Sequence, residues 1–130
     1  RSSKGVLRGL HFQKTKPQGK LVRVTQGEVF DVAVDIDPNS ATYTEWVAIT
    51  LTGTNHKQFY VPPGYAHGFF VLSDTADFQY KCTSFYDSAD EAGIVWSDEQ
   101  VAIDWPIESP PKVSEKDAVL PSIRDLASNW

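Results

Sequence analysis

Acid–base side chains occur on apolar faces of two short segments, where solubility does not require them. In segment 20–24 a period of two places Lys20 on the same face as two valines. In segment 77–82 the same period places Tyr80 on an apolar face. A lysine in a protein interior costs several kcal/mol unless it finds an anionic partner. Both residues are therefore candidates for proton transfer, although a strand-end lysine can also reach water and a core tyrosine needs only one hydrogen bond.

The chain contains three histidines, and two of them lie in apolar segments. His56 follows a Thr-Asn turn and is expected to be a solvated loop residue. His11 shares its face with Leu7, and His67 follows the rigid turn 62–66 and begins an apolar strand. A hydrogen bond is enough to explain one buried histidine. Two of them, together with a buried lysine, favour a functional site.

Other kinds of catalytic site are disfavoured by residue spacing. A zinc or iron site in a β-barrel generally needs two ligands on one strand, but Gln13 stands where a second histidine would follow His11. Cys82 has no CxxC partner, and its neighbours predict burial rather than activation. The sequence has no G-x-S-x-G motif and no glycine-rich phosphate loop. This leaves proton transfer by histidine, lysine, tyrosine and a carboxylate, with no metal and no cofactor.

The composition limits the class of protein. A chain of 130 residues predicts a single domain, 1–130, because one core commonly holds about 100–200 residues. The net charge of −5 disfavours a nucleic-acid-binding protein, which needs a positive face for phosphates. No apolar run reaches the roughly 18 residues that cross a bilayer, and no signal peptide is recognisable. The single cysteine cannot form an internal disulfide, which favours the reducing cytoplasm.

Most of the chain consists of short apolar runs separated by glycine, proline and other turn residues. The runs are rich in Val, Ile, Thr, Phe and Tyr, which is typical of β-strands. In segment 30–37 apolar residues alternate with Asp31 and Asp35, which predicts a half-buried strand with a solvated face. Segment 69–72 is apolar on both faces, as in a central strand. Many short strands at nearly regular spacing predict a closed barrel or a sandwich.

The C-terminal segment predicts short helices that lie on this barrel. Ser114 fits an N-cap, with Asp117 at the third helical position, where a capping-box carboxylate is common. Pro121 can open a second helical turn, 122–127. On the residues alone, a capping role is therefore the expected function of Asp117.

Several blocks of sequence follow one another in a fixed order between residues 6 and 117. They are VLRGLHFQ (6–13), GKLVRV (19–24), PPGYAHGF (62–69), LSDTADFQYK (72–81) and SEKD (114–117). Together they strongly resemble the dTDP-4-dehydrorhamnose 3,5-epimerase family. The Pro-x-Gly-x-x-His element within 62–67 also matches the second cupin motif. The resemblance implies an all-β, cupin-type jelly-roll barrel with short C-terminal helices.

The resemblance implies an isomerase of L-rhamnose biosynthesis, which inverts C3 and C5 of a dTDP-linked 4-keto-6-deoxy sugar without a cofactor. The C4 ketone acidifies both C–H bonds, so that a base can form an enolate and an acid can return the proton to the opposite face. Two alternatives remain open. Relatives that epimerise only one centre share most of these residues, and a sugar-nucleotide-binding barrel without turnover would have the same fold.

The catalytic roles are also carried over from the family. His11 corresponds to the base, and Asp117 corresponds to the carboxylate that orients its imidazole. Lys20 corresponds to the cation that stabilises the oxyanion at O4. Tyr80 corresponds to the acid that returns a proton from the face opposite His11, and a phenol is protonated at neutral pH as this role requires.

The resemblance assigns further residues to substrate binding. Arg8 and Lys116 correspond to ligands of the pyrophosphate, for which an arginine offers two parallel hydrogen bonds. His67 corresponds to a ligand of the sugar-phosphate end, and Glu91 to a further ligand-contacting position. Tyr86 corresponds to the aromatic residue that stacks on thymine. A homodimer is implied, with neither a nucleic acid nor a membrane as partner.

The strand around Gly9 raises a difficulty of phase. Strict alternation places Arg8 and His11 on opposite faces, although both should face the ligand. A β-bulge at Gly9 would reset the phase, and we predict one there.

A second difficulty concerns the N-terminus: the sequence contains no methionine and begins with Arg1. The family's N-terminal segment, which carries nucleotide-binding groups and exchanges strands across the dimer, is therefore expected to be missing.

Overall fold

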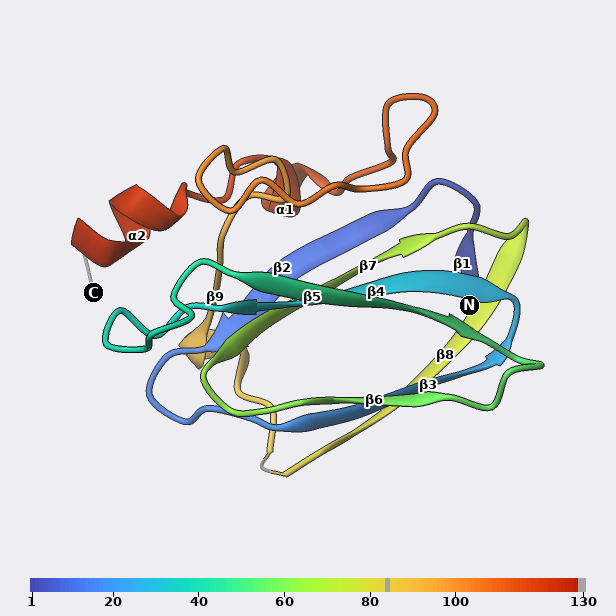
Figure 1. Cartoon of the computed structure of the whole chain (residues 1–130), viewed down its shortest axis with the longest axis horizontal. Helices are drawn as coiled ribbons and strands as arrows, with labels where there is room; N and C mark the ends of the chain where they lie inside the picture. Colours follow the sequence, from blue (N-terminus) through green and yellow to red (C-terminus); the bar gives the residue numbers. More distant parts are fainter. Residues whose placement is uncertain (84, 129–130) are drawn as a thin grey trace.

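The computed structural model describes residues 1–83 and 85–128, which form two antiparallel β-sheets that face each other (Figure 1). The four-stranded sheet has the order β1-β8-β3-β6, and the five-stranded sheet has the order β5-β4-β7-β2-β9. The strands are β1 (Ser2–Ser3), β2 (Leu7–Gln13), β3 (Lys20–Gln26), β4 (Glu28–Asp35), β5 (Trp46–Thr52), β6 (Gln58–Val61), β7 (Tyr65–Val71), β8 (Thr75–Cys82) and β9 (Glu91–Gly93). The predicted β architecture is confirmed.

Two apolar layers hold these elements together. The first layer joins β3 and β8 to β4, β5 and β7, so it lies between the sheets; it contains Val22, Val24, Val29, Leu51, Val71 and Ala76. The second layer joins the other face of the five-stranded sheet to the C-terminal segment, which runs along that sheet in Figure 1. Ile94, Val101, Trp105 and Ile123 belong to this layer. The five-stranded sheet is therefore the middle layer, and its central strand β7 is apolar on both faces, as segment 69–72 predicts.

The C-terminal segment contains the short helices that were expected. They are α1 (Glu115–Ala118) and α2 (Ile123–Ser128), whereas the short helical turn η1 (Ser88–Asp90) lies before β9 and was not expected. The Ser114 hydroxyl accepts the N–H of Asp117 at 3.1 Å, which confirms the N-cap. The buried Asp98 carboxylate accepts the N–H of Ile123 at 2.7 Å and thereby fixes the start of α2. Within the described ranges, no helix is long and apolar enough to cross a membrane.

The prediction of a solvated face on β4 is wrong. Asp31 is 0% exposed and Asp35 is 3% exposed. They share their strand face with Val29, which belongs to the layer between the sheets, so this face points into the barrel. Each carboxylate has a partner there: Asp31 bonds to His67, and Asp35 accepts the hydroxyl of Ser40 at 2.6 Å. Side chains alternate along β4 as expected, but the second sheet covers the face that alternation alone would leave in water.

The predicted β-bulge is present at Gly9. Arg8 pairs with Phe69 and His11 pairs with His67, with a shift of register between them. Phe69 and His67 are two residues apart on β7 and share a face, so their partners Arg8 and His11 share that face too. Gly9 has a φ of +119°, and a Cβ placed there would lie 2.7 Å from the Cα of Gly68. Only glycine satisfies both requirements, so it sets the phase of the strand that carries His11.

Gly9→Ala is expected to lower the free energy of unfolding by about 3 kcal/mol, because a left-handed φ and a backbone clash act together. The measurement is urea denaturation followed by tryptophan fluorescence.

Gly5→Ala is the matched control. Gly5 also has a positive φ, +83°, but nothing lies within 4 Å of the position of its Cβ. The control should lose only about 1 kcal/mol, the cost of the backbone conformation itself. Equal losses in the two variants would contradict a role for the close approach of Gly9 to β7.

Candidate active site

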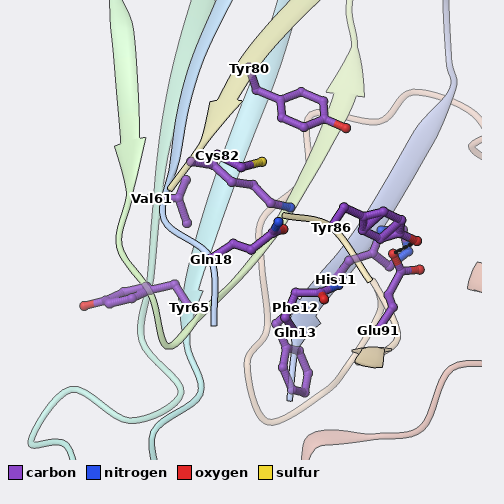
Figure 2. Close-up of a pocket in the computed structure, with 11 residues that line it drawn as sticks. His11, Phe12, Gln13, Gln18, Val61, Tyr65, Tyr80, Cys82, Tyr86 and Glu91 are labelled. Carbon is purple, nitrogen blue, oxygen red and sulfur yellow. Dashed lines mark hydrogen bonds between the residues drawn. The ribbon is translucent and has the colours of Figure 1, made fainter. Parts of the chain in front are cut away.

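A pocket of about 230 Å³ opens between the two sheets (Figure 2). Five of the predicted site residues line it, namely His11, Lys20, Tyr80, Tyr86 and Glu91. His11 and Glu91 extend from β2 and β9 of the five-stranded sheet, whereas Lys20 and Tyr80 extend from β3 and β8 of the four-stranded sheet. The pocket therefore has an imidazole on one wall and a phenol with an ammonium group on the facing wall.

The His11 imidazole is held by Asp117, which is 2% exposed. The Nε2 of His11 lies 2.6 Å from Oδ1 of Asp117, and Oδ2 of the same carboxylate accepts the N–H of Gly9 at 3.1 Å. Because an ionised carboxylate can only accept, Nε2 is the donor and Nδ1 is left as the basic nitrogen. Asp117 also occupies the helix position predicted for a capping box, but only its backbone N–H serves the cap. Its side chain orients the histidine.

Lys20 lies on the inner face of β3 with Val22 and Val24, as predicted. Burial lowers the pKa of Lys20, and the charges of Cys82, Glu91 and Asp31 oppose this effect without reversing it. Its ammonium nitrogen lies 5.9 Å from the centre of the Tyr80 ring. The pocket thus contains a partly desolvated cation, whose interaction with a negative oxygen is stronger than it would be in water.

Tyr80 faces the pocket but is not a core residue. Its side chain is 57% exposed, and its ring contacts that of Phe78 at a centroid distance of 5.9 Å. Figure 2 shows its hydroxyl directed across the opening, away from the strand that carries it. The alternative of a buried structural tyrosine is therefore wrong, and the hydroxyl is accessible to a ligand.

Glu91 joins two further side chains at the mouth of the pocket. The hydroxyl of Tyr86 donates to Glu91 at 2.6 Å, and the ammonium group of Lys116 donates to the other carboxylate oxygen. The hydrogen bond to Glu91 raises the pKa of both Tyr86 and Lys116. Burial acts to raise the pKa of Glu91, but these two hydrogen bonds, together with the charges of His11 and Lys116, outweigh it and lower that pKa. Glu91 is therefore ionised at neutral pH.

Two predicted binding residues are placed differently. His67 is 7% exposed and lies behind the lining, where its Nε2 bonds to Asp31 Oδ1 at 2.8 Å. It is the cross-strand partner of His11, so the two histidines lie side by side on the inner face. Arg8 is exposed on that same face, outside the lining of the pocket. The site therefore contains two histidine–aspartate pairs, of which only His11–Asp117 reaches the cavity.

Sequence reasoning missed several of the residues that build the site. Gln13 and Gln18 line the pocket and are 6% and 8% exposed. The period of two would have found Gln13, which follows His11 by two residues on β2. Nothing local reveals Asp31, because its partner His67 is distant in sequence. Cys82 was predicted to be buried, but it is exposed and lines the pocket, because the last residues of β8 extend beyond the core.

The described residues contain no group of three or more His, Cys, Asp or Glu side chains that could hold a metal ion. What the pocket does offer is a base, a phenol and a cation around one cavity. The fold and the site together define a jelly-roll protein with an imidazole, a phenol and an ammonium group around one pocket.

Comparison with known proteins identifies the family. The family model for dTDP-4-dehydrorhamnose 3,5-epimerase matches residues 1–125, and the chain belongs to this family. The dTDP-4-dehydrorhamnose 3,5-epimerase of Escherichia coli (strain K12) is 54% identical over 127 residues, which cover 97% of this chain and 69% of the relative. That of Methanothermobacter thermautotrophicus is 53% identical over 118 residues, which cover 89% of this chain and 64% of the relative. The chain thus spans about two thirds of the length of these proteins.

Solved structures agree with this assignment. The dTDP-6-deoxy-D-glucose-3,5-epimerase of Legionella pneumophila, in complex with dTDP-4-keto-L-rhamnose, superposes with a TM-score of 0.95 at 51% identity, over 98% of this chain and 68% of that one. A 3'-monoepimerase from Streptomyces bikiniensis superposes with a TM-score of 0.93 at 29% identity, over 98% of this chain and 65% of that one. The predicted family, the jelly-roll fold and the isomerase class are confirmed.

Lys20→Met is expected to raise the free energy of unfolding at pH 7 by about 1 kcal/mol, because it removes a partly desolvated charge. The gain should shrink as pH rises. Lys20 holds its proton less tightly in the folded protein than in the unfolded chain, so wild-type stability increases between its lowered pKa and the ordinary value of 10.5. The measurement is urea denaturation of both proteins at pH 7 and pH 10.

Lys57→Met, at an exposed lysine, is the control and should change stability little. A Lys20→Met variant less stable than wild type at pH 7 would show that the ammonium group contributes to the fold.

Proposed function

We propose that this protein epimerises C3 and C5 of dTDP-4-dehydro-6-deoxy-D-glucose to give dTDP-4-dehydro-L-rhamnose, by removal and return of protons through an enolate. The observation that carries the proposal is the facing arrangement of the His11–Asp117 pair and of Tyr80 with Lys20 around one pocket. The 51% identical Legionella pneumophila epimerase in complex with dTDP-4-keto-L-rhamnose supports the choice of substrate. A homodimer in the cytoplasm completes the proposal.

Proton removal is the step assigned to His11. The free Nδ1 takes a proton from the carbon next to the C4 ketone, which acidifies that C–H bond. The imidazole becomes an imidazolium, and the Asp117 carboxylate 2.6 Å from Nε2 stabilises the new charge. Because Asp117 is buried and fixed by two further hydrogen bonds, from Gly9 N–H and through the helix cap, little reorganisation accompanies the step.

The facing wall supplies the other two functions. Negative charge develops on O4 as the enolate forms, and the ammonium group of Lys20 stabilises it in a partly desolvated site. Tyr80 then returns a proton to the face of the ring opposite His11, which inverts the centre. Its hydroxyl is exposed to the cavity, so a ligand can reach it.

In this proposal the diphosphate and the thymine of the substrate occupy the mouth of the pocket. Lys116 and Arg8 are exposed cations suited to the diphosphate, and Tyr86 offers a half-exposed ring to thymine. His67, held by Asp31 and paired with His11, supports the sugar-phosphate end of the site from behind the pocket lining, and Glu91 contributes to ligand binding. A second candidate function is epimerisation of one centre only, which the similarity to the Streptomyces bikiniensis 3'-monoepimerase favours.

Incubation of the protein with the 4-keto sugar nucleotide in D2O distinguishes these functions. Deuterium is expected at both C3 and C5, with inversion of both, when the product is followed by proton NMR. Exchange at one centre alone would support the single-centre epimerase. If neither C3 nor C5 exchanged, the protein would be a sugar-nucleotide-binding protein without turnover, and the proposal would be overturned.

His11→Ala and Tyr80→Phe should separate the two proton transfers. His11→Ala removes the base and is expected to lower the rate of deuterium exchange by at least about 100-fold. Tyr80→Phe keeps the base, so exchange should continue while inversion is lost. His56→Ala, at an exposed loop histidine, is the control and should keep both activities. Full inversion by Tyr80→Phe would rule out this tyrosine as the acid.

A further inference from the structure

The mouth of the pocket carries a chain of three hydrogen-bonded side chains centred on Glu91. Tyr86 comes from the segment after β8, Glu91 from the start of β9, and Lys116 from α1. Tyr86 is 56% exposed, and the side chain of Lys116 is 66% exposed. The side chain of Glu91, by contrast, is only 13% exposed. The carboxylate is thus the fixed member of the chain, and its two partners are the exposed ones.

An exposed tyrosine or lysine ordinarily samples several rotamers, and a ligand that needs one of them loses affinity when it imposes that rotamer. A hydrogen bond to an ionised carboxylate is about twice as strong as one between neutral groups. Glu91 can therefore select one position of the Tyr86 ring before any ligand arrives. Lys116 bonds the second carboxylate oxygen and so holds the carboxylate itself.

The backbone around Glu91 connects these three hydrogen-bonded side chains to His11. Gln13 pairs with Glu91 and His11 pairs with Gly93 along the β2–β9 ladder. Figure 2 shows the ring of Tyr86 beside Glu91, on the same wall of the pocket as His11. The distance from the Tyr86 ring to the imidazole is thus set by a paired stretch of sheet and one hydrogen bond.

We propose that Glu91 is a positioning residue, which acts through Tyr86 by holding its ring at the mouth in the orientation that accepts the nucleobase. This inference rests on the proposed function, in which Tyr86 stacks on thymine. It replaces a direct contact of Glu91 with the ligand by an indirect role. Loss of Glu91 then weakens nucleotide binding and leaves the proton transfers at His11 and Tyr80 nearly intact.

The test uses thymidine diphosphate as the probe, with calorimetry on the full chain and exchange kinetics on the sugar nucleotide. Glu91→Ala is expected to raise the Kd for thymidine diphosphate and the KM by about 10-fold, with kcat within about 3-fold of wild type. Tyr86→Phe keeps the ring but loses the hydrogen bond, so it should raise the Kd by a similar factor.

Two further variants separate positioning from other roles. A glutamine can bond the Tyr86 hydroxyl through either end of its amide, so Glu91→Gln should restore the Kd to within about 3-fold of wild type. The double variant of Glu91→Ala with Tyr86→Phe should bind no more weakly than either single variant, because both remove the same interaction. Glu115→Ala removes an exposed carboxylate next to Lys116 and is the control for charge, with an unchanged Kd expected.

Several results would contradict the positioning role of Glu91. Wild-type affinity in Glu91→Ala, additive losses in the double variant, or a Glu91→Gln variant as weak as Glu91→Ala would overturn the positioning role. A drop in kcat at constant KM would place Glu91 in the chemistry and overturn it equally. If Glu91→Ala does not fold, Tyr86→Phe and Glu91→Gln carry the test. Failure of the wild-type protein to bind thymidine diphosphate would instead remove the proposed function, on which the inference depends.

Discussion

The hydrogen bonds of one buried carboxylate organise the site. Asp117 bonds His11 through one oxygen and the backbone of Gly9 through the other, while its own N–H is held by Ser114. These contacts join α1 to β2 across more than a hundred residues of sequence. A buried carboxylate costs free energy unless such partners surround it, so the helix, the bulge and the histidine stabilise one another. The tautomer of the base follows from this same interaction.

The polar residues inside the barrel make it a poor source of stability. Lys20, Asp31 and His67 occupy positions on the inner faces that apolar side chains would fill in a purely structural barrel. Stability has to come from the first apolar layer and from the second layer on the outer face of the five-stranded sheet. Proteins commonly break local rules of this kind at functional sites and compensate elsewhere.

Some parts of the fold and of the site can be predicted from the sequence, and others cannot. Alternation and Gly9 predicted the bulge, because a glycine was the one residue that could reset the strand between Arg8 and His11. The burial of Asp31 and Asp35 could not be predicted, since alternation separates two faces without saying what covers each. The sequence pattern alone predicts a capping role for Asp117, and only the family resemblance points to His11, because the contact between the two residues is non-local. The Tyr86–Glu91–Lys116 chain could not be predicted either, because Lys116 is 25 residues from Glu91 in sequence and no local pattern pairs them.

The C-terminal segment has two functions that cannot be separated. Its apolar residues, Trp105 and Ile123 among them, cover the outer face of the five-stranded sheet. Its helix α1 also contributes to the site, because it supplies Asp117 to His11 and Lys116 to the mouth of the pocket. Asp117 is the one buried residue of α1, so α1 is held against β2 by the hydrogen bonds of this carboxylate and by the packing of Val113 just before the helix. The segment that stabilises the molecule by burial therefore also holds the imidazole at the cavity.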